Sequence, residues 1–272
     1  MKDETYQILP ELLKEEPSIV GSLGRINAEI FVPECAHAIV SATIARLSER
    51  KPLIVVAPTN AEAEKLFDDL KVFIGFEKVD FFPSWETLPF ERISPGVETM
   101  GKRLRVLHRL VNSEENLEVI VTSARALVQK LSIQKQIFPI FLKTGDLIDQ
   151  SELLEKLFAF GYKREYQVEH RGEVAVRGSI IDIWPSTADS PVRVDLWGDE
   201  IERLCEFGVA NQRTKYAVDG VEVFPCRELI LKAEMLEKAG FMADQQSWGS
   251  MEWEKLASGE LFDGMESFMP WL

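Results

Sequence analysis

The letters SPGVETMGKR at residues 94–103 contain glycines and a lysine at a spacing that can bind a phosphate. From Gly96 to Lys102 they fit G-x-x-x-x-G-K, a pattern in which backbone N–H groups wrap the phosphates and the lysine reaches the terminal ones. The pattern is completed by a Ser or Thr hydroxyl that holds Mg²⁺. Arg103 follows the lysine here, and a cation does not ligate a cation, so the metal-binding part of the motif is missing.

The residues before Gly96 also argue against a phosphate loop. Such a loop joins a buried strand to the N-terminus of a helix, whose dipole favours the anion. Pro83, Pro89 and Pro95 each remove a hydrogen-bond donor that a central strand would need. We therefore predict a glycine-containing turn that leads into a helix over residues 98–111, and no ATP binding at this motif.

Other residues with catalytic or metal-binding chemistry do not combine into a recognisable site. His37, His108 and His170 are scattered along the sequence, without metal-ligand spacing or a nearby nucleophile. A group of acids in WGDEIERL and just before it fits a turn between strands with solvated carboxylates better than a Mg²⁺ site. These acids are Asp195, Asp199, Glu200 and Glu202. We predict no catalytic residue, no metal site and no cofactor.

The composition is that of a folded, acidic protein. Of 272 residues, 46% are apolar and 28% are charged, and 31 Lys and Arg stand against 45 Asp and Glu for a formal charge of -14. A field of that sign repels nucleic acid and polyphosphates, so DNA is a poor default partner. The apolar runs are too short to span a bilayer and the first residues lack a signal-peptide pattern. We therefore predict a cytoplasmic protein with no membrane partner.

The cysteines are widely spaced and form no C-x-x-C pair. This spacing fits neither a disulfide framework nor a zinc site. We predict that Cys35, Cys205 and Cys226 are thiols of the hydrophobic core.

The first half of the sequence alternates buried strands with amphipathic helices. Runs of β-branched residues such as LIVVAP indicate strands, and apolar residues at helical spacing indicate the helices between them. Thr59 or Asn60 can cap one of these helices. Strands are predicted at 28–33, 51–58, 78–83 and 117–123, and helices at 35–50, 61–75, 98–111 and 124–131. The alternation predicts an α/β fold with a parallel sheet wrapped by helices.

From about Phe138 the pattern changes. Two segments, 166–185 and 190–209, alternate apolar and polar residues around glycine turns, which is typical of antiparallel sheet. Further elements are a helix at 151–162, a buried strand at 218–225 and helices at 231–241 and 251–262. This order predicts a small α+β domain with antiparallel sheet, inserted into the α/β domain. The apolar end at 265–272 indicates either a domain that is cut before it closes or a docked tail.

Two segments resemble a known family. WETLPFERISP at 85–95 and the stretch from GEVAVRGSIIDIWP to ANQRT at 172–214 are similar to the amino-terminal module of bacterial transcription-repair coupling factors (Mfd), a module that resembles UvrB. The similarity runs from about Ala28 to the end. It implies a degenerate helicase-like (RecA-like) parallel-sheet domain in two parts with an inserted UvrA-docking domain between them. These parts are expected at residues 1–130, 131–214 and 215–272.

The resemblance also implies a function. It indicates a non-catalytic docking module that recruits UvrA to stalled transcription complexes in nucleotide excision repair. Family members are far longer, and they reach RNA polymerase and DNA through a polymerase-binding region and a translocase motor further on, which implies that the apolar end is a boundary within a longer chain. Two alternatives stay open: an active ATP-dependent helicase domain, and a nucleic-acid-binding module, which the charge of -14 opposes.

The resemblance places the nucleotide site of the fold between its first strand and first helix, in FVPECAHAIV. No glycine doublet and no lysine stand there, and Glu34 would repel a phosphate at short range. The residues of this degenerate site are Glu34, Cys35, Ala36 and His37, between Pro33 and Ala38. We therefore expect no nucleotide cofactor, and the missing lysine separates the docking module from the active helicase.

The arginines that meet UvrA in UvrB align with Arg164 and Arg177 of this sequence, while a third aligns with Ala175. Along EVAVRG, Val174 and Val176 share one face of a strand, so Arg177 faces outward if the valines face the core. An exposed guanidinium on a rigid strand suits capture of a partner carboxylate. Arg171 and Glu173 flank a hairpin tip and are expected to assist. The alternative is that Arg177 is an ordinary solvated charge.

Overall fold

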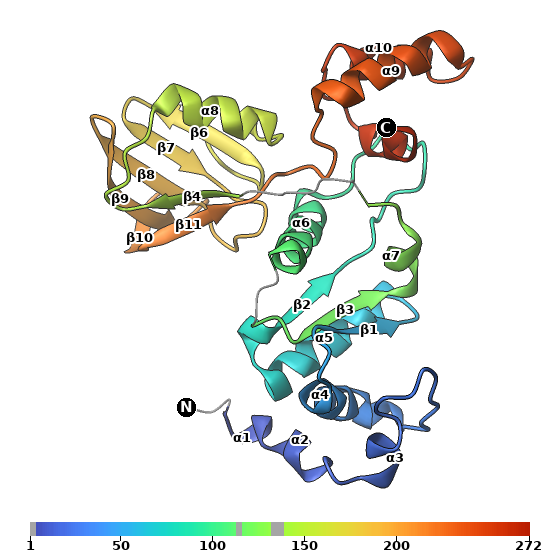
Figure 1. Cartoon of the computed structure of the whole chain (residues 1–272). Coiled ribbons are helices and arrows are strands. Elements are labelled where there is room, and N and C mark those ends of the chain that lie inside the picture. Colours follow the sequence, from blue (N-terminus) through green and yellow to red (C-terminus); the bar gives the residue numbers. More distant parts are fainter. Residues whose placement is uncertain (1–3, 113–115, 132–138) are drawn as a thin grey trace. The chain divides into compact units, whose positions relative to one another are not determined.

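The computed structural model describes residues 4–112, 116–131 and 139–272 (Figure 1). The chain divides into two compact units. The first comprises residues 1–84 and 106–129, and the second comprises residues 85–105 and 130–272. Each unit is described by itself below.

The first unit is built on a parallel sheet of three strands. The strands are β1 (Leu53–Ala57), β2 (Val79–Phe82) and β3 (Val119–Ser123), in the order β1-β3-β2. Both neighbouring pairs are parallel. Each residue of the central strand β3 is buried, as expected for a strand with helices on both faces. The predicted parallel sheet and these three strands are confirmed.

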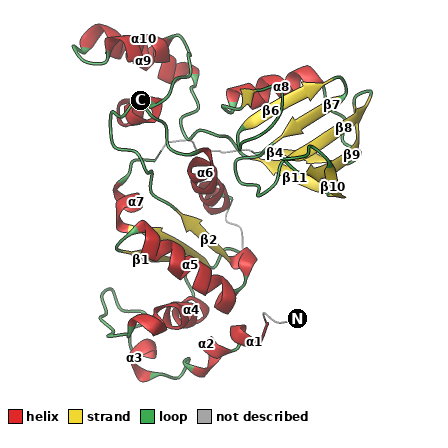
Figure 2. Ribbon diagram, turned by 180° about the vertical axis from the view of Figure 1, so that it is seen from behind, coloured by secondary structure: helices red, strands yellow, loops and turns green. Residues whose placement is uncertain are grey.

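Helices cover both faces of this sheet (Figure 2). Helices α4 (His37–Leu47) and α5 (Asn60–Ile74) pack on the face that includes Val119 and Val121. The end of α6 (Val97–Val111) and α7 (Ala124–Val128) pack on the face of Ile120. Thr59 caps α5, because its hydroxyl accepts a hydrogen bond from the Glu62 amide at 3.2 Å. The predicted helices and this cap are confirmed.

The predicted strand at residues 28–33 is wrong. These residues lie outside all helices and strands, and Phe31 is 97% exposed. An apolar run becomes a strand only where a neighbouring strand satisfies its backbone groups, and none pairs with this segment among the described residues. The remaining short helices of the first unit are α1 (Glu4–Gln7), α2 (Leu9–Leu12), α3 (Pro17–Val20), η1 (Glu34–Ala36) and η2 (Phe76–Lys78).

The second unit contains a six-stranded sheet in the order β10-β9-β8-β7-β6-β5. Its strands are β5 (Lys163–Arg164), β6 (Glu173–Arg177), β7 (Ile180–Ile183), β8 (Val192–Trp197), β9 (Glu200–Phe207) and β10 (Thr214–Ala217). All neighbours are antiparallel except β5 and β6. The predicted antiparallel sheet is confirmed, and its hairpin turns use glycines with positive φ such as Gly178 and Gly198.

One face of this sheet is covered. Helix α8 (Gln150–Ala159) and the two-stranded ribbon of β4 (Ile140–Lys143) and β11 (Gly220–Val223) pack on it. Val223 is fully buried in the same core as Val174. The predicted domain limit between residues 214 and 215 therefore falls inside β10, and β11 beyond it shares the core of the antiparallel sheet.

The end of the chain is docked. Helices α9 (Ala233–Gln245) and α10 (Ser250–Ala257) pack together, and the final turn η3 (Met265–Trp271) closes their core. Met265, Phe268 and Met269 are buried, and the Phe268 ring lies 4.8 Å from that of Trp253. Of the two interpretations of the apolar end, the docked tail describes this arrangement. Among the described residues, no helix combines the length and apolar character needed to cross a bilayer.

Candidate docking surface

The G-x-x-x-x-G-K spacing lies in a helix. From Val97 onward its residues belong to α6, as predicted for this segment. A Cβ added to Gly101 would come within 2.7 Å of the Ser186 side chain, so this glycine permits a close helix contact. Lys102 forms an ion pair of 2.7 Å with Glu98 one turn earlier. The second glycine of the motif therefore allows α6 to pack closely against Ser186, and the lysine forms an ion pair on the helix surface.

Arg103, the residue that replaces the motif's hydroxyl, forms a buried ion pair with Glu228. Both side chains are fully buried, and the Trp85 indole N–H donates to the same carboxylate at 3.1 Å. Burial raises the pKa of Glu228, while the adjacent guanidinium opposes that shift. The sequence contained no signal for this pair, because its members are 125 residues apart along the chain.

The segment for which a degenerate nucleotide site is predicted borders an open cavity of about 840 Å³ in the first unit. Glu34, Cys35 and His37 line it, together with Lys65 and two further acids of α5. Glu34 lies 3.8 Å from Lys65, and His37 Nε2 lies 3.2 Å from the Val32 carbonyl oxygen. Cys35 is exposed, so the prediction of a core thiol is wrong for it, whereas Cys205 and Cys226 are buried as predicted.

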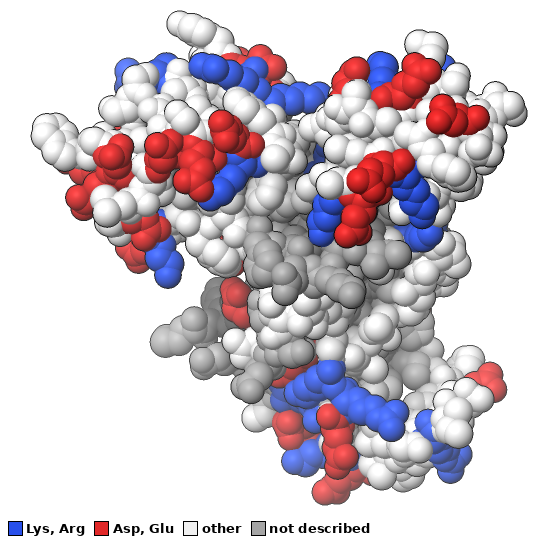
Figure 3. Space-filling view, turned by 45° about the horizontal axis from the view of Figure 1, so that its top comes forward, with Lys and Arg blue, Asp and Glu red and all other residues white. Residues whose placement is uncertain are grey.

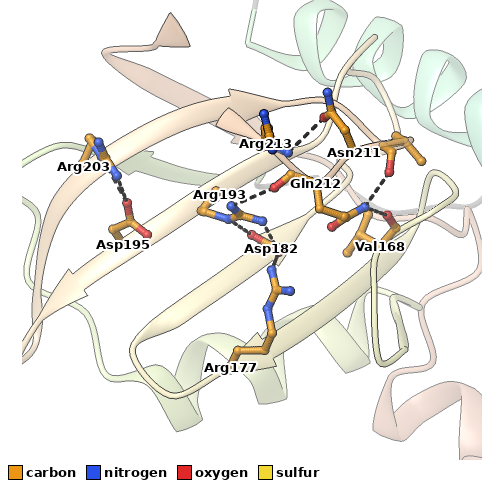
Figure 4. A network of polar contacts seen from close by, with 10 residues as sticks. Val168, Arg177, Asp182, Arg193, Asp195, Arg203, Asn211, Gln212 and Arg213 are labelled. Atoms are coloured by element: carbon orange, nitrogen blue, oxygen red, sulfur yellow. Dashed lines mark hydrogen bonds and ion pairs between the residues drawn. The ribbon is translucent and has the colours of Figure 1, made fainter. Parts of the chain in front are cut away.

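The open face of the antiparallel sheet carries alternating arginines and aspartates (Figure 4). The strand register places Asp182 opposite Arg193, and Asp195 opposite Arg203. Arg177 joins them from β6 on the same face. We name this set, Arg177, Asp182, Arg193, Asp195 and Arg203, the arginine–aspartate face. It lies opposite the core because successive strand residues point to opposite sides.

Asp182 is the centre of this face. Its carboxylate is 1% exposed and accepts two hydrogen bonds from Arg193, Nε to Oδ1 at 2.7 Å and Nη2 to Oδ2 at 2.9 Å. Arg177 Nη2 donates to Oδ2 of the same carboxylate. The hydrogen bonds with Asp182 raise the pKa of Arg193. Sequence analysis missed Asp182 and Arg193, although both stand at outward positions of alternating strands.

Arg177 lies on the predicted face. Val174 is fully buried, and the Arg177 side chain is 42% exposed. Two details differ from the prediction. The guanidinium is already paired within the chain, and Ala175 on the same face is buried against Val168 and Phe207. The outward face is therefore exposed at Arg177 and covered at Ala175, two residues earlier on the same strand.

Arg164 lies in the edge strand β5, next to Val174 in the parallel register. It is exposed, and its side chain has no hydrogen bond or ion pair to any other described residue. Arg177 is three residues further along β6, so the two positions are ~10 Å apart along the strand direction and belong to opposite faces. The structure thus does not bring the two predicted arginines together on one face.

Arg171 and Glu173 hold the turn before β6. Arg171 donates to the Ala188 carbonyl at 2.9 Å and pairs with Asp189 at 3.1 Å and with Glu98. Glu173 accepts hydrogen bonds from the Glu169 and His170 amides at 2.7 and 2.8 Å. Burial alone would raise the pKa of Glu173. The hydrogen bonds from these amides and from the His170 ring lower the pKa by more, so the net shift is downward.

Acidic and basic side chains alternate in small groups on the face of the molecule seen in Figure 3. No group of three or more His, Cys, Asp or Glu among the described residues is arranged to hold a metal ion. Of the acids considered in the sequence, Asp195 pairs with Arg203 at 2.7 Å. On the open face of the antiparallel sheet, the aspartates pair with arginines.

Comparisons with known proteins identify the family. Residues 140–229 match the model of the UvrB interaction domain. The transcription-repair-coupling factor of Mycobacterium bovis is 39% identical over 257 residues, which are 89% of this chain and 20% of that protein. Those of Escherichia coli and Bacillus subtilis are 29% and 30% identical, over 81% and 71% of this chain and 19% and 16% of theirs. The chain spans about a fifth of the length of these relatives. It belongs to the family of transcription-repair coupling factors, with a UvrB interaction domain at residues 140–229.

Proposed function

We propose that this chain is a docking module that recruits UvrA in transcription-coupled nucleotide excision repair. One observation carries the proposal. The UvrB interaction domain, residues 140–229, contains the antiparallel sheet, and Arg177 on the open face of that sheet is half-exposed. RNA polymerase and DNA, the other partners expected for the family, would be reached through regions outside this chain.

The arginine–aspartate face suits a protein partner. Its side chains stand on hydrogen-bonded strands, so no backbone segment has to be ordered when a partner binds. A guanidinium matches a carboxylate with two parallel hydrogen bonds, and arginine is enriched at interface hot spots. Arg177 is the candidate contact on this face, and Arg164 is the candidate contact on the edge strand. Arg171 and Glu173 support both by fixing the turn before β6.

For the first unit we propose a degenerate RecA-like domain that has no nucleotide cofactor. The support is chemical, because Glu34, Glu62 and Asp69 line the cavity and Lys65 is the cation on its wall. A phosphate in such surroundings meets more negative than positive charge. The domain limits at 130 and 214 and the cytoplasmic location also stay proposals.

The proposal is tested by measuring binding of purified UvrA to the full chain and to Arg177→Glu and Arg164→Glu. We expect Arg177→Glu to weaken binding by about 2–5 kcal/mol, because the partner's carboxylate is left unpaired and meets a like charge. Arg164→Glu should act in the same direction. Lys156→Glu makes the same charge change at an exposed position of α8 and is the control. Unchanged affinity of both arginine variants, with unchanged melting, would refute this docking site.

The second candidate function is an active nucleotide-driven helicase domain, which the cavity near α4 favours by its size. Calorimetry and phosphate release with Mg·ATP separate the two functions. We expect neither binding nor hydrolysis. Saturable ATP binding that is lost in Lys102→Ala would show that the glycine motif binds phosphate after all.

A further inference from the structure

Asp182 accepts three hydrogen bonds, which come from two different arginines. Arg193 donates two of them, and its remaining nitrogen, Nη1, donates to the Gln212 carbonyl at 3.2 Å. Its guanidinium also stacks over the Phe207 ring, 4.8 Å from the centroid. With a side chain only 13% exposed, Arg193 is held on every side.

Arg177 is held differently. Its single hydrogen bond to Asp182 comes from Nη2, and Nε and Nη1 make no hydrogen bond to any described residue. If Arg177 leaves, Asp182 keeps both bonds from Arg193, so no buried carboxylate is left unpaired. Removing a partner from a buried charge is costly only when nothing else compensates it. Arg177 therefore depends on Asp182 for its position, whereas Asp182 does not depend on Arg177 to balance its charge.

We propose that Asp182 and Arg193 are positioning residues for the UvrA docking site: they hold the Arg177 guanidinium at the sheet surface, where its Nε and Nη1 remain available to a carboxylate of the partner. This inference rests on the proposed function. It assigns no contact with the partner to Asp182, which is 1% exposed, and none to Arg193. Without Asp182, the long Arg177 side chain would sample many rotamers, and the entropy lost when the partner fixes one of them would weaken binding.

A double-mutant cycle on the full chain tests the inference. Affinity for purified UvrA is measured for Arg177→Ala, Asp182→Asn and the double variant. We expect Arg177→Ala to weaken binding about 30-fold or more and Asp182→Asn about tenfold. The double variant should be no weaker than Arg177→Ala, because Asp182 acts only through that arginine. A merely structural role would instead make the two losses multiply.

Asp263→Asn is the matched control, because it makes the same substitution beside another arginine, Arg227, outside the antiparallel sheet. It should change affinity by less than about twofold. Arg193→Lys is the substitute variant if Asp182→Asn fails to fold. Lysine keeps the positive charge but cannot make the two parallel hydrogen bonds to Asp182, so this variant should weaken binding about as much as Asp182→Asn.

The outcomes separate the two hypotheses. Unchanged affinity of Arg177→Ala would remove the docking role of Arg177 and the positioning role with it. Weakened binding in Arg177→Ala with normal affinity in Asp182→Asn and Arg193→Lys would overturn the positioning role alone. Multiplying losses in the double variant would overturn it as well.

Discussion

Two regions of the second unit use the same arginine–carboxylate chemistry in opposite surroundings. The first, which we name the buried ion pairs, consists of Arg103 with Glu228 and Arg227 with Glu266. The second is the arginine–aspartate face of the antiparallel sheet. In the first region all four side chains are at most 10% exposed, whereas Arg177 and Arg203 are 42% and 58% exposed.

The buried ion pairs connect segments that are distant in sequence. Arg227 donates to Glu266 at 3.0 Å, to the Ser94 hydroxyl at 3.1 Å and to the Phe262 carbonyl at 3.1 Å. It thereby ties the loop before α6 to the docked tail. A partner protein cannot reach such a pair, and breaking it strands a charge away from water.

The open face differs because water and a partner can both replace an internal bond. Exposed ion pairs contribute little to stability, so they can be rearranged without unfolding the sheet. The comparison teaches that burial, rather than residue type, separates arginines that hold this fold from arginines that are available for recognition.

The largest expected effect comes from breaking a buried pair. Glu228→Ala should lower the free energy of unfolding by about 3–5 kcal/mol, because the buried Arg103 guanidinium loses the carboxylate that it faces. Urea denaturation followed by tryptophan fluorescence measures this loss. The exposed Glu202→Ala is the control and should stay within about 0.5 kcal/mol of the parent. A loss below about 1 kcal/mol for Glu228→Ala would contradict the distinction between the two regions.

A smaller loss is expected where α6, which carries Arg103, approaches Ser186. Gly101→Ala places a methyl group 2.7 Å from the Ser186 side chain and should cost about 1–3 kcal/mol in unfolding free energy. Gly240 of α9 is the matched helical glycine, with its nearest neighbour 3.9 Å from an added Cβ. Gly240→Ala should stabilise the chain by up to about 1 kcal/mol through helix propensity. Equal effects of the two substitutions would exclude the close contact.

The pH dependence of Glu173 tests the turn beside the proposed docking surface. Its folded pKa is lowered, so its stabilisation is present above the unfolded pKa of about 4.3 and is lost as pH falls through the lower folded value. Glu173→Gln should reduce stability near pH 7 by on the order of 1 kcal/mol and flatten the loss below about pH 4. Thermal melts from neutral to acid pH measure this. Glu165→Gln, at an exposed neighbour, should keep the parent profile.

The smallest effect is expected on the open face itself. Arg203 pairs with Asp195 at 2.7 Å but is 58% exposed, so Arg203→Ala should change the unfolding free energy by at most about 0.5 kcal/mol. The same urea titration used for Glu228→Ala measures it. A loss as large as that of Glu228→Ala would mean that the open pairs also hold the fold.

Local elements of this protein could be predicted from the sequence. The apolar period along EVAVRG places Val174 inside and Arg177 outside, and Thr59 caps α5, because both depend on residues close in sequence. The strand predicted at 28–33 failed for the complementary reason, since a strand requires a partner that local residues do not specify.

The sequence by itself determined most of the longer helices and strands, the change from parallel to antiparallel sheet and the outward position of Arg177. The tertiary structure alone decided which distant groups meet. Arg103 pairs with Glu228 and Arg177 with Asp182, and strand β11 pairs with β4. Periodicity acts over a few residues, whereas pairing across a fold depends on register and burial that arise only when distant segments pack together. Asp182 is recognised as the shared partner of two arginines only because β6, β7 and β8 lie side by side.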